Sequence, residues 1–318
     1  MNSKKILITG AAGQIGSELV LALREKYGNS NVIPMYHKNM PKNAIEPYVI
    51  GDATKKELLE EYIKKYQINE IYHLVGILSA KGEQNPSLAY EVNMNSLKNV
   101  LDIAKELKEQ GKTIKIFWPS SIAAFGPTTP RENTPQKTVL EPSTMYGVTK
   151  VAGELLVNYY FIKYGIDTRS LRYPGIISWK TPPGGGTTDY AVDIFYKALK
   201  NEKYSCFLSK GSYLPMMYMD DAIKATIQLM DADASKIRVR TSYNITAVSF
   251  DPEEIYNEIK KHIPLFEMDY SPDFRQKIAD SWPKSIDDSF ARSDWGWKHE
   301  FGLSKIVTDM IKNLKTIL

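Results

Sequence analysis

The chain has 318 residues, 43% of them hydrophobic and 25% charged, and its formal net charge is +4. This length is enough for one large domain or two smaller ones with a substantial buried core. Because the net charge is small and the lysines are scattered along the chain, neither a nucleic acid nor an anionic membrane is expected as a partner.

Cysteine and histidine are scarce. Cys206 is the only cysteine, so no intrachain disulfide can form, and a reducing, cytoplasmic location is expected. The four histidines lie far apart and have no cysteine partners, so no metal site is expected. The apolar runs are too short for a signal peptide or a membrane span, and neither is predicted.

Strand and helix patterns alternate along the first half of the chain. Thr54 and Glu57 have the spacing of a capping box at the start of one helix. The alternation predicts βαβ units and a doubly wound parallel sheet of the Rossmann type, which is an α/β fold. In chain order the predicted elements are a strand over 4–10, a helix over 18–27, a strand over 31–36, a helix over 54–66, a strand over 70–76, a helix over 87–110, a strand over 113–119, a helix over 146–164 and a strand over 166–174.

The alternation becomes looser in the second half of the chain. Residues 181–190, TPPGGGTTDY, combine proline, glycine and threonine and are predicted to form a loop. Residues 214–230 resemble one more strand and helix. We therefore predict a Rossmann domain over residues 1–175, rejoined by about 215–243, and a smaller lobe formed mainly by residues 176–318.

Three glycines directly follow the first strand and open the first helix: Gly10, Gly13 and Gly16. Glycine permits a tight turn and lets the backbone approach a pyrophosphate, while the helix N-terminus offers free N–H groups and a positive potential. The alternative is a structural turn without a ligand. The position between a strand and a helix is the one that the dinucleotide motif requires, so we predict dinucleotide binding here.

The glycine spacing, G-x-x-G-x-x-G, resembles that of the short-chain dehydrogenase/reductase superfamily, extended type. PSSIAAFG (119–126) matches the superfamily's serine-bearing strand end, where the catalytic hydroxyl aligns with Ser121 rather than Ser120. Asn93 matches its structural asparagine, and Tyr173 lies in the segment that runs along the nicotinamide. The resemblance implies NAD as the cofactor, bound by the Rossmann domain.

The same resemblance implies which residues contact NAD. Asp52, in GDAT, takes the place of an aspartate that lies against the adenine, and HLVG (73–76) matches another strand end of the superfamily. The implied contacts are Gly10, Gly13, Gln14, Ile15, Gly16, Tyr36, His37, Asp52, Ala53, Leu74, Val75, Gly76, Asn93, Tyr146, Lys150 and Tyr173.

The sequence holds four Tyr-x-x-x-Lys pairs, where chance predicts roughly two. Only Tyr146 and Lys150 follow, by about 25 residues, a serine at the carboxyl end of a parallel strand, where open α/β sheets bind ligands. The two residues are neighbours on one helical face. The other three pairs, which begin at Tyr159, Tyr196 and Tyr256, are predicted to be exposed helical pairs.

A phenol has a pKa near 10 and is a poor base at pH 7. A lysine cation and a positively charged nicotinamide nearby would both favour the phenolate. One unit charge at about 4 Å contributes roughly 4 kcal/mol at an effective dielectric of 20, or about three pKa units. We therefore predict that Lys150 lowers the pKa of Tyr146, that Tyr146 is the general base, and that Ser121 holds the substrate oxygen while the substrate carbon passes a hydride to NAD.

A closer resemblance, to the short-chain type of L-threonine 3-dehydrogenase, covers essentially the whole chain. This family oxidises the threonine β-hydroxyl with NAD to 2-amino-3-oxobutanoate and does not use zinc. The resemblance therefore implies L-threonine as the substrate. The segments that carry it are GILSAKGE (76–83), LAYEVNMN (88–95), TMYGVTK (144–150), SLRYPGIISWK (170–180), GGGTTDYAVDIFYKA (184–198), LPMMYMDDA (214–222), YNITA (243–247) and DSWP (280–283).

The family resemblance implies substrate contacts from Ser79, Ser121, Tyr146, Thr187 and, more weakly, Thr188. Taken alone, the glycine-rich stretch before Thr188 is a surface loop. The resemblance instead favours a mobile segment that covers the substrate, with its three glycines as hinges.

Two further features follow from the family resemblance. Trp282 borders the pocket or, as is commoner for an aromatic residue, belongs to the core. A homodimer is implied, with helices 87–110 and 146–164 at its interface, although their apolar positions are also explained by internal packing.

The second strand departs from the family pattern. An acidic residue normally ends this strand and binds the ribose hydroxyls of the adenosine. Here the strand ends at Tyr36, followed by His37 and Lys38. We predict that NAD is preferred over NADP, but with less discrimination than an aspartate would give.

Two alternatives stay open. A nucleotide-sugar epimerase or dehydratase shares the fold and the serine, tyrosine and lysine set, but usually needs a larger lobe, and residues 184–198 do not suit a sugar nucleotide. A non-catalytic Rossmann regulator would bind the nucleotide without turnover, and the intact catalytic set argues against it.

Overall fold

The computed structural model describes residues 4–318. Its main sheet has seven strands in the order β10-β6-β5-β4-β1-β2-β3, and every neighbouring pair is parallel. The predicted doubly wound sheet is therefore confirmed. The strands are β1 (Ile6–Thr9), β2 (Val32–Tyr36), β3 (Val49–Ile50), β4 (Glu70–His73), β5 (Lys115–Ser121), β6 (Thr168–Tyr173) and β10 (Tyr243–Asn244).

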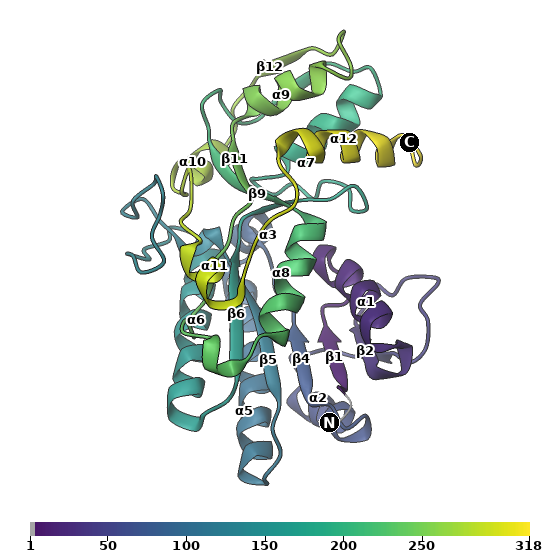
Figure 1. Cartoon of the computed structure of the whole chain (residues 1–318), viewed down its shortest axis with the longest axis vertical. Coiled ribbons are helices and arrows are strands. Elements are labelled where there is room, and N and C mark those ends of the chain that lie inside the picture. The colour runs from purple at the N-terminus through teal and green to yellow at the C-terminus, as the bar shows by residue number, and fades with distance from the viewer. Residues whose placement is uncertain (1–3) are drawn as a thin grey trace.

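Helices cover both faces of this sheet (Figure 1). Ile6 and Ile8 of β1 pack on one face with α1 and α8, whereas Leu7 packs on the other face with α2, α5 and α6. Both faces of β1 are therefore buried, which explains why its sequence is continuously apolar. The helices are α1 (Gln14–Tyr27), α2 (Lys56–Lys65), α5 (Ser96–Glu109), α6 (Met145–Tyr164) and α8 (Met219–Asp231).

The single helix predicted over 87–110 is interrupted. Helix α4 (Pro86–Tyr90) is followed by a π-helical turn over Glu91–Asn95 before α5 begins. Asn93 lies in this turn and holds the backbone of Ile77, accepting from its N–H at 2.7 Å and donating to its carbonyl oxygen at 3.1 Å. The wider turn accommodates this cross-link, as π-bulges near functional sites often do.

The predicted capping box at α2 was wrong. The helix begins at Lys56 and its N-terminus has no side-chain cap. The Thr54 hydroxyl instead donates to Asp52 Oδ1 at 2.8 Å, and the Thr54 N–H donates to the same oxygen at 2.9 Å. A carboxylate two residues earlier thus takes the hydroxyl that the capping box needed.

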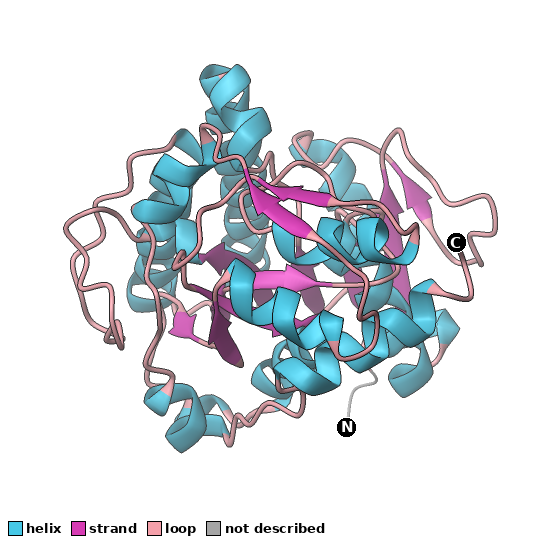
Figure 2. Ribbon diagram, turned by 90° about the horizontal axis from the view of Figure 1, so that it is seen from above, coloured by secondary structure: helices cyan, strands magenta, loops and turns pink. Residues whose placement is uncertain are grey.

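Most of the remaining elements form a smaller lobe over the carboxyl end of the main sheet (Figure 1). In the view from above, this lobe lies nearest to the viewer (Figure 2). Strands β7, β9 and β11 form one small sheet, and β8 pairs with β12. The chain returns to the main sheet through α8 and β10, and we keep a domain boundary near residue 175 as a proposal. The lobe contains β7 (Gly175–Ile177), α7 (Tyr190–Leu199), β8 (Tyr204–Cys206), β9 (Leu214–Tyr218), β11 (Val248–Phe250), α9 (Pro252–Lys260), β12 (Met268–Tyr270), α10 (Arg275–Asp280) and α12 (Leu303–Leu314). Helix α3 (Ser79–Gln84) packs instead beside α6, and α11 (Ser289–Trp295) beside β10.

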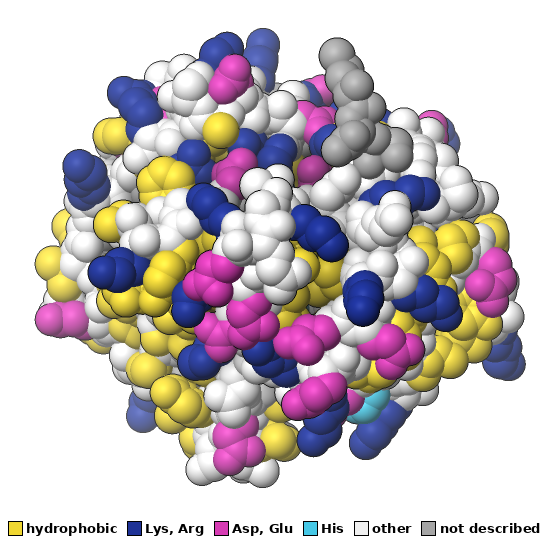
Figure 3. Space-filling view, turned by 90° about the horizontal axis from the view of Figure 1, so that it is seen from below, with side chains coloured by type: hydrophobic (Ala, Val, Ile, Leu, Met, Phe, Trp, Pro, Cys, Tyr) yellow, Lys and Arg dark blue, Asp and Glu magenta, His cyan; other side chains and the backbone are white. Residues whose placement is uncertain are grey.

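None of the helices within residues 4–318 has the length and apolarity that a membrane crossing needs. On the lower face of the molecule, basic and acidic side chains are interspersed with hydrophobic ones (Figure 3). Charge of one sign therefore does not dominate this face.

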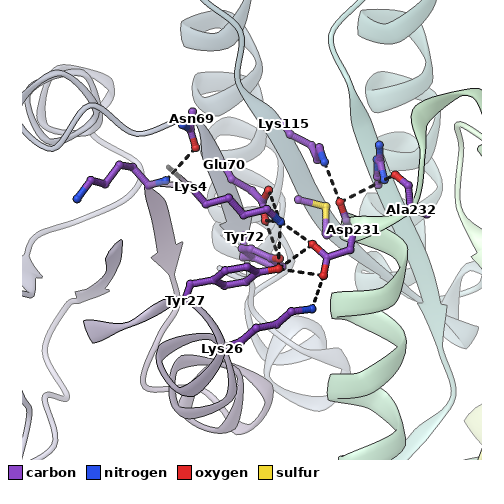
Figure 4. A network of polar contacts seen from close by, with 12 residues as sticks. Lys4, Lys26, Tyr27, Asn69, Glu70, Tyr72, Lys115, Asp231 and Ala232 are labelled. Atoms are coloured by element: carbon purple, nitrogen blue, oxygen red, sulfur yellow. Dashed lines mark hydrogen bonds and ion pairs between the residues drawn. The ribbon is translucent and has the colours of Figure 1, made fainter. Parts of the chain in front are cut away.

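A polar network ties α8 to the amino end of the main sheet (Figure 4). Asp231, the last residue of α8, accepts from Lys4 Nζ at 2.5 Å and from the Tyr27 hydroxyl at 2.7 Å, and it pairs with Lys26. Lys4 also pairs with Glu70 of β4 at 3.2 Å. Burial alone would raise the pKa of Asp231, but the bonds from Lys26, Lys4 and Tyr27 outweigh it and hold the pKa at about 2.

Asp231→Asn is therefore expected to destabilise the protein by about 1–2 kcal/mol at pH 7, measured by urea unfolding. The folded-state pKa is depressed, so the carboxylate's contribution is present above the unfolded pKa near 3.9 and is lost as the pH falls through about 2. The difference between wild type and variant should shrink over that window. Glu202→Gln, which removes an exposed pair with Lys197, should leave the stability essentially unchanged. A difference for Asp231→Asn that does not depend on pH would contradict this account.

Candidate active site

The glycine turn after β1 is built to receive an anionic group. Gly10 has φ +70°, and its carbonyl oxygen accepts from the Gly13 N–H at 3.0 Å. Helix α1 begins directly after Gly13, without a side-chain cap and without an acidic residue in its first turn. A Cβ on Gly16 would clash with the Gly10 carbonyl oxygen. The turn thus leaves the start of α1 uncapped and requires glycine at positions 10 and 16, which fits the pyrophosphate of a dinucleotide.

The other predicted cofactor residues lie along the same edge of the sheet. The strand order reverses at β1, which pairs with both β2 and β4, and the carboxyl ends beside such a switch point form the usual nucleotide crevice. Gln14 and Ile15 open α1. Tyr36 and His37 end and follow β2, Asp52 and Ala53 follow β3, Leu74, Val75 and Gly76 follow β4, and Tyr173 ends β6.

Several of these side chains already have partners within the chain. Asn93 donates to Thr149 Oγ1 at 3.0 Å in addition to its bonds with Ile77. The Tyr173 hydroxyl bonds to Thr226. These side chains therefore position the surrounding backbone, and the backbone near Tyr173 is the part left for a ligand.

Tyr36 does not reproduce the acid that it replaces. Its side chain is only 5% exposed, and its ring lies edge-on to that of Tyr48 with 5.9 Å between centroids. His37 and Lys38, the next two residues, are exposed. The end of β2 thus presents an aromatic pair followed by two exposed basic side chains, rather than a carboxylate.

The catalytic candidates meet at the end of β5. Ser121 ends this strand, and Tyr146 and Lys150 lie in the first two turns of α6. A Cβ on Gly147 would clash with the Ala123 carbonyl oxygen just beyond β5, so glycine lets α6 approach the strand end. The Ser121 hydroxyl lies close enough to Tyr146 to lower the pKa of its phenol.

Burial dominates the pKa values of both Tyr146 and Lys150. Burial raises the pKa of Tyr146 to about 12, and the bond to Ser121 lowers it only in part. Lys150 Nζ lies 5.3 Å from the Tyr146 ring centroid, but it donates to the Pro119 carbonyl oxygen at 2.5 Å and lies 4.5 Å above the Trp118 ring. Burial lowers the pKa of Lys150 to about 7, opposed by Glu154. Within the protein, burial therefore dominates the pKa of Tyr146, and the lowering of that pKa by Lys150 together with the nicotinamide charge stays a prediction.

A buried ion pair next to the candidate catalytic residues was not identified from the sequence. Glu154 is 1% exposed and accepts two bonds from the Arg172 guanidinium at 2.8 and 2.7 Å. Ser120 also donates to it at 2.5 Å. Glu154 lies one turn after Lys150, and Ser120 precedes Ser121, so the pair supports two elements of the site. The signal in the sequence was a carboxylate four residues after Lys150 and an arginine in the strand segment before Tyr173.

The predicted substrate residues lie around the same strand end. Ser79 opens α3 and is 7% exposed. Helix α3 packs beside Tyr146, since a Cβ on Gly82 would lie 4.0 Å from Tyr146 Cβ. Thr187 is 3% exposed, and Thr188 approaches Gly175 so closely that a Cβ there would lie 2.7 Å from its methyl group.

The glycine-rich loop is more ordered than the prediction assumed. The Asp189 carboxylate accepts from the Gly184 N–H at 2.6 Å and from the Gly186 N–H at 2.9 Å. Of the three predicted hinge glycines, only Gly185 has a positive φ, at +91°. Asp189 thus closes this loop into a turn, and sequence reasoning did not identify it.

Two alternatives from the sequence are resolved by burial. Trp282 is 5% exposed and belongs to the core of the lobe, the commoner outcome for such a residue. Tyr159 is 50% exposed, as predicted. Tyr196 and Tyr256 instead pack, partly buried, against the lobe's core, so the prediction that they are exposed was wrong.

Within residues 4–318, no cluster of His, Cys, Asp or Glu side chains has the arrangement of a metal site.

A Rossmann sheet, a glycine cradle before α1, and a serine, tyrosine and lysine set at the end of β5 define a dinucleotide-dependent oxidoreductase. The chain belongs to the NAD dependent epimerase/dehydratase family, whose model matches residues 6–246. An uncharacterized epimerase/dehydratase of Staphylococcus saprophyticus is 48% identical over 316 residues, which cover 97% of each chain.

Solved structures similar to this chain carry more specific descriptions. A GalE-like L-threonine dehydrogenase from Cupriavidus necator, in its holo form, is 52% identical with a TM-score of 0.94 and covers 98% of this chain and 99% of its own. The L-threonine dehydrogenase of Clostridium difficile is 50% identical with a TM-score of 0.95 over 100% and 99% of the two chains. A monomeric L-threonine 3-dehydrogenase from a metagenome is 49% identical with a TM-score of 0.93 over 98% and 99%.

Proposed function

We propose that this chain is an NAD-dependent L-threonine 3-dehydrogenase of the short-chain, metal-independent type, which oxidises the β-hydroxyl of L-threonine to 2-amino-3-oxobutanoate. One observation carries the proposal. Ser121 at the end of β5 and Tyr146 and Lys150 at the start of α6 lie together at the same sheet edge as the glycine cradle, in a chain about half identical over its whole length to L-threonine dehydrogenases.

In the proposed mechanism, Ser121 donates to the substrate hydroxyl oxygen and holds it beside Tyr146. Tyr146 takes the hydroxyl proton as the general base. When it is protonated, Lys150 stabilises the phenolate by its positive charge. NAD, when bound, would accept the hydride from the substrate's Cβ, and its positively charged nicotinamide would also favour the phenolate. The residues along the glycine turn and the strand ends would hold NAD, and Ser79, Thr187 and Thr188 would contact the amino-acid part of threonine.

An absorbance assay tests the reaction. Purified protein should produce NADH, followed at 340 nm, from L-threonine in a panel of amino acids and hydroxy acids, and a chelator should not reduce the rate. The proposal fails if chelator abolishes activity, or if threonine gives no signal while a nucleotide sugar is converted.

NAD is expected to be preferred over NADP by a modest ratio of kcat/KM, since no carboxylate at the end of β2 repels a 2′-phosphate. Tyr36→Asp should widen that ratio by adding an acceptor for the ribose hydroxyls, worth roughly 1.5–3 kcal/mol. Arg24, whose charge acts on Tyr36, would offset part of the cost of burying this carboxylate. His37→Ala, which removes one of the two basic side chains after β2, is the companion variant. A wild-type kcat/KM that is higher with NADP than with NAD would instead assign His37 and Lys38 as a phosphate site.

We also propose a homodimer in the cytoplasm. Leu155, Tyr159 and Ile162 form an exposed apolar stripe on α6, with exposures of 60, 50 and 72%. A self-complementary stripe of this kind suits a two-fold interface. A reducing compartment is supported by the single cysteine, Cys206, which is buried. The mass of the protein by light scattering tests the dimer, and a single chain mass would refute it.

A further inference from the structure

Glu18 makes an unusual contact for a residue of the cofactor helix. It lies on α1 and is 7% exposed. Its carboxylate accepts from the Ser178 hydroxyl at 2.7 Å and from Lys180 Nζ at 2.9 Å, across 160 and 162 residues of sequence. The Lys180 N–H also donates to the Ser178 hydroxyl oxygen at 3.2 Å. Ser178 and Lys180 therefore wrap around one nearly buried carboxylate.

The position of this contact links the two halves of the proposed site. Helix α1 starts at the glycine cradle, and Glu18 lies in its second turn. Ser178 and Lys180 lie between β7 and the segment over residues 181–189, which holds Thr187 and Thr188. Asp189 closes the far end of that segment. Glu18 therefore fastens the near end of the substrate segment to the helix that would receive the pyrophosphate.

The carboxylates near Lys180 favour a positively charged side chain at this position. Asp220 lies close enough that Glu18 contributes, after burial, to raising its pKa, and Lys180 opposes this effect. Lys180, which contacts Glu18, thus acts electrostatically on both carboxylates, and its removal would leave them to repel one another. An exposed ion pair contributes little on average. This one has a nearly buried acceptor fixed by a second hydrogen bond, which makes a charge-assisted bond stronger and more directional.

We propose that Glu18 and Lys180 are a positioning pair for the substrate: they fix residues 181–189 to helix α1, so that affinity for the amino acid depends on them while affinity for the cofactor does not. The inference rests on the proposed function, because it takes residues 181–189 as the segment that covers threonine. Neither side chain is assigned any contact with the reacting atoms.

The test compares Glu18→Gln, Lys180→Met and the double variant with wild type. Each single variant should raise the KM for L-threonine by about five- to twentyfold, with the dissociation constant of NADH, measured by fluorescence, changed by less than about threefold. The double variant should be no worse than the poorer single variant, because both changes remove the same interaction. Lys224→Met is the matched control, since Lys224 pairs with Glu300 and donates to the Lys298 carbonyl oxygen instead of Glu18, and it should leave both constants unchanged.

Hydrogen exchange separates this inference from the proposed function. With NADH alone, residues 181–189 should exchange faster in Lys180→Met than in wild type, while residues 252–260 should not change. If the wild type oxidises threonine but the KM and the exchange rates of the variants equal those of wild type, the positioning role is refuted. Additive losses in the double variant, or a rise in the NADH dissociation constant that matches the rise in KM, would also refute it. If the exchange difference is found but threonine is not oxidised, the anchor stands and the proposed substrate falls.

Discussion

Tyr146→Phe is expected to lower kcat for threonine oxidation by at least about 100-fold, the scale expected for removing a general base. The phenyl ring keeps the packing of α6 against the strand end, so the dissociation constant of NADH should stay within about twofold of wild type. The loss should appear in kcat and kcat/KM together, which is the pattern of an interaction made in the transition state. Steady-state kinetics and a fluorescence titration with NADH measure both quantities.

Two other tyrosines with a lysine four residues later serve as matched controls. Tyr159 is exposed on α6, and the Tyr256 hydroxyl donates to the Phe266 carbonyl oxygen at 3.2 Å within the lobe. Tyr159→Phe and Tyr256→Phe should therefore leave kcat within about twofold. Equal losses in all three variants would show that the spacing alone, and not the position at the end of β5, had selected Tyr146.

Gly16→Ala is expected to weaken NADH binding by about 10- to 100-fold, because overpacking by one methyl group typically costs about 1–3 kcal/mol. The added Cβ would clash with the Gly10 carbonyl oxygen and approach the backbone of Ala11 to 3.0 Å. Backbone atoms cannot turn aside as a flexible side chain would, so the cradle itself has to shift. Isothermal titration with NADH measures the effect, and the melting temperature reports any loss of folding.

Gly302→Ala is the control for this variant. Gly302 precedes α12, and a Cβ there would meet nothing within 4 Å. Its substitution should leave the affinity for NADH unchanged. If Gly16→Ala binds NADH as tightly as wild type, the turn after β1 is only a structural turn.

The alternation of strands and helices was predictable because strands such as β1 and β2 are buried on both faces and so read as short apolar runs. The breaks in that pattern were not. The π-helical turn depends on Asn93 reaching Ile77, and the start of α2 depends on Asp52 capturing Thr54. In both cases a side chain bonds to backbone in a way that helical periodicity does not record. The small strands of the lobe, such as β7 with three residues, are too short to give a periodic signal.

Within the site, the sequence located the residues that belong to short motifs. The glycines, Ser121, Tyr146 and Lys150 stand at strand ends or helix starts, where motif and topology coincide. The side chains that support those residues were not identified from the sequence, because each pairs with a residue from another element of the fold. Glu18 meets Lys180 across 162 residues, and Glu154 meets Arg172 between a helix and a strand. The direction of the Tyr146 pKa shift was also not predictable from the sequence, because burial decides it.

The most direct test of the proposed function uses L-threonine that carries deuterium on Cβ. Mass spectrometry of the reduced cofactor then reports where the transferred hydride came from. We predict one deuterium in each molecule of NADH formed, together with 2-amino-3-oxobutanoate or its decarboxylation product. Reduced cofactor without deuterium, or no reduction with threonine while a nucleotide sugar is converted, would contradict the assignment.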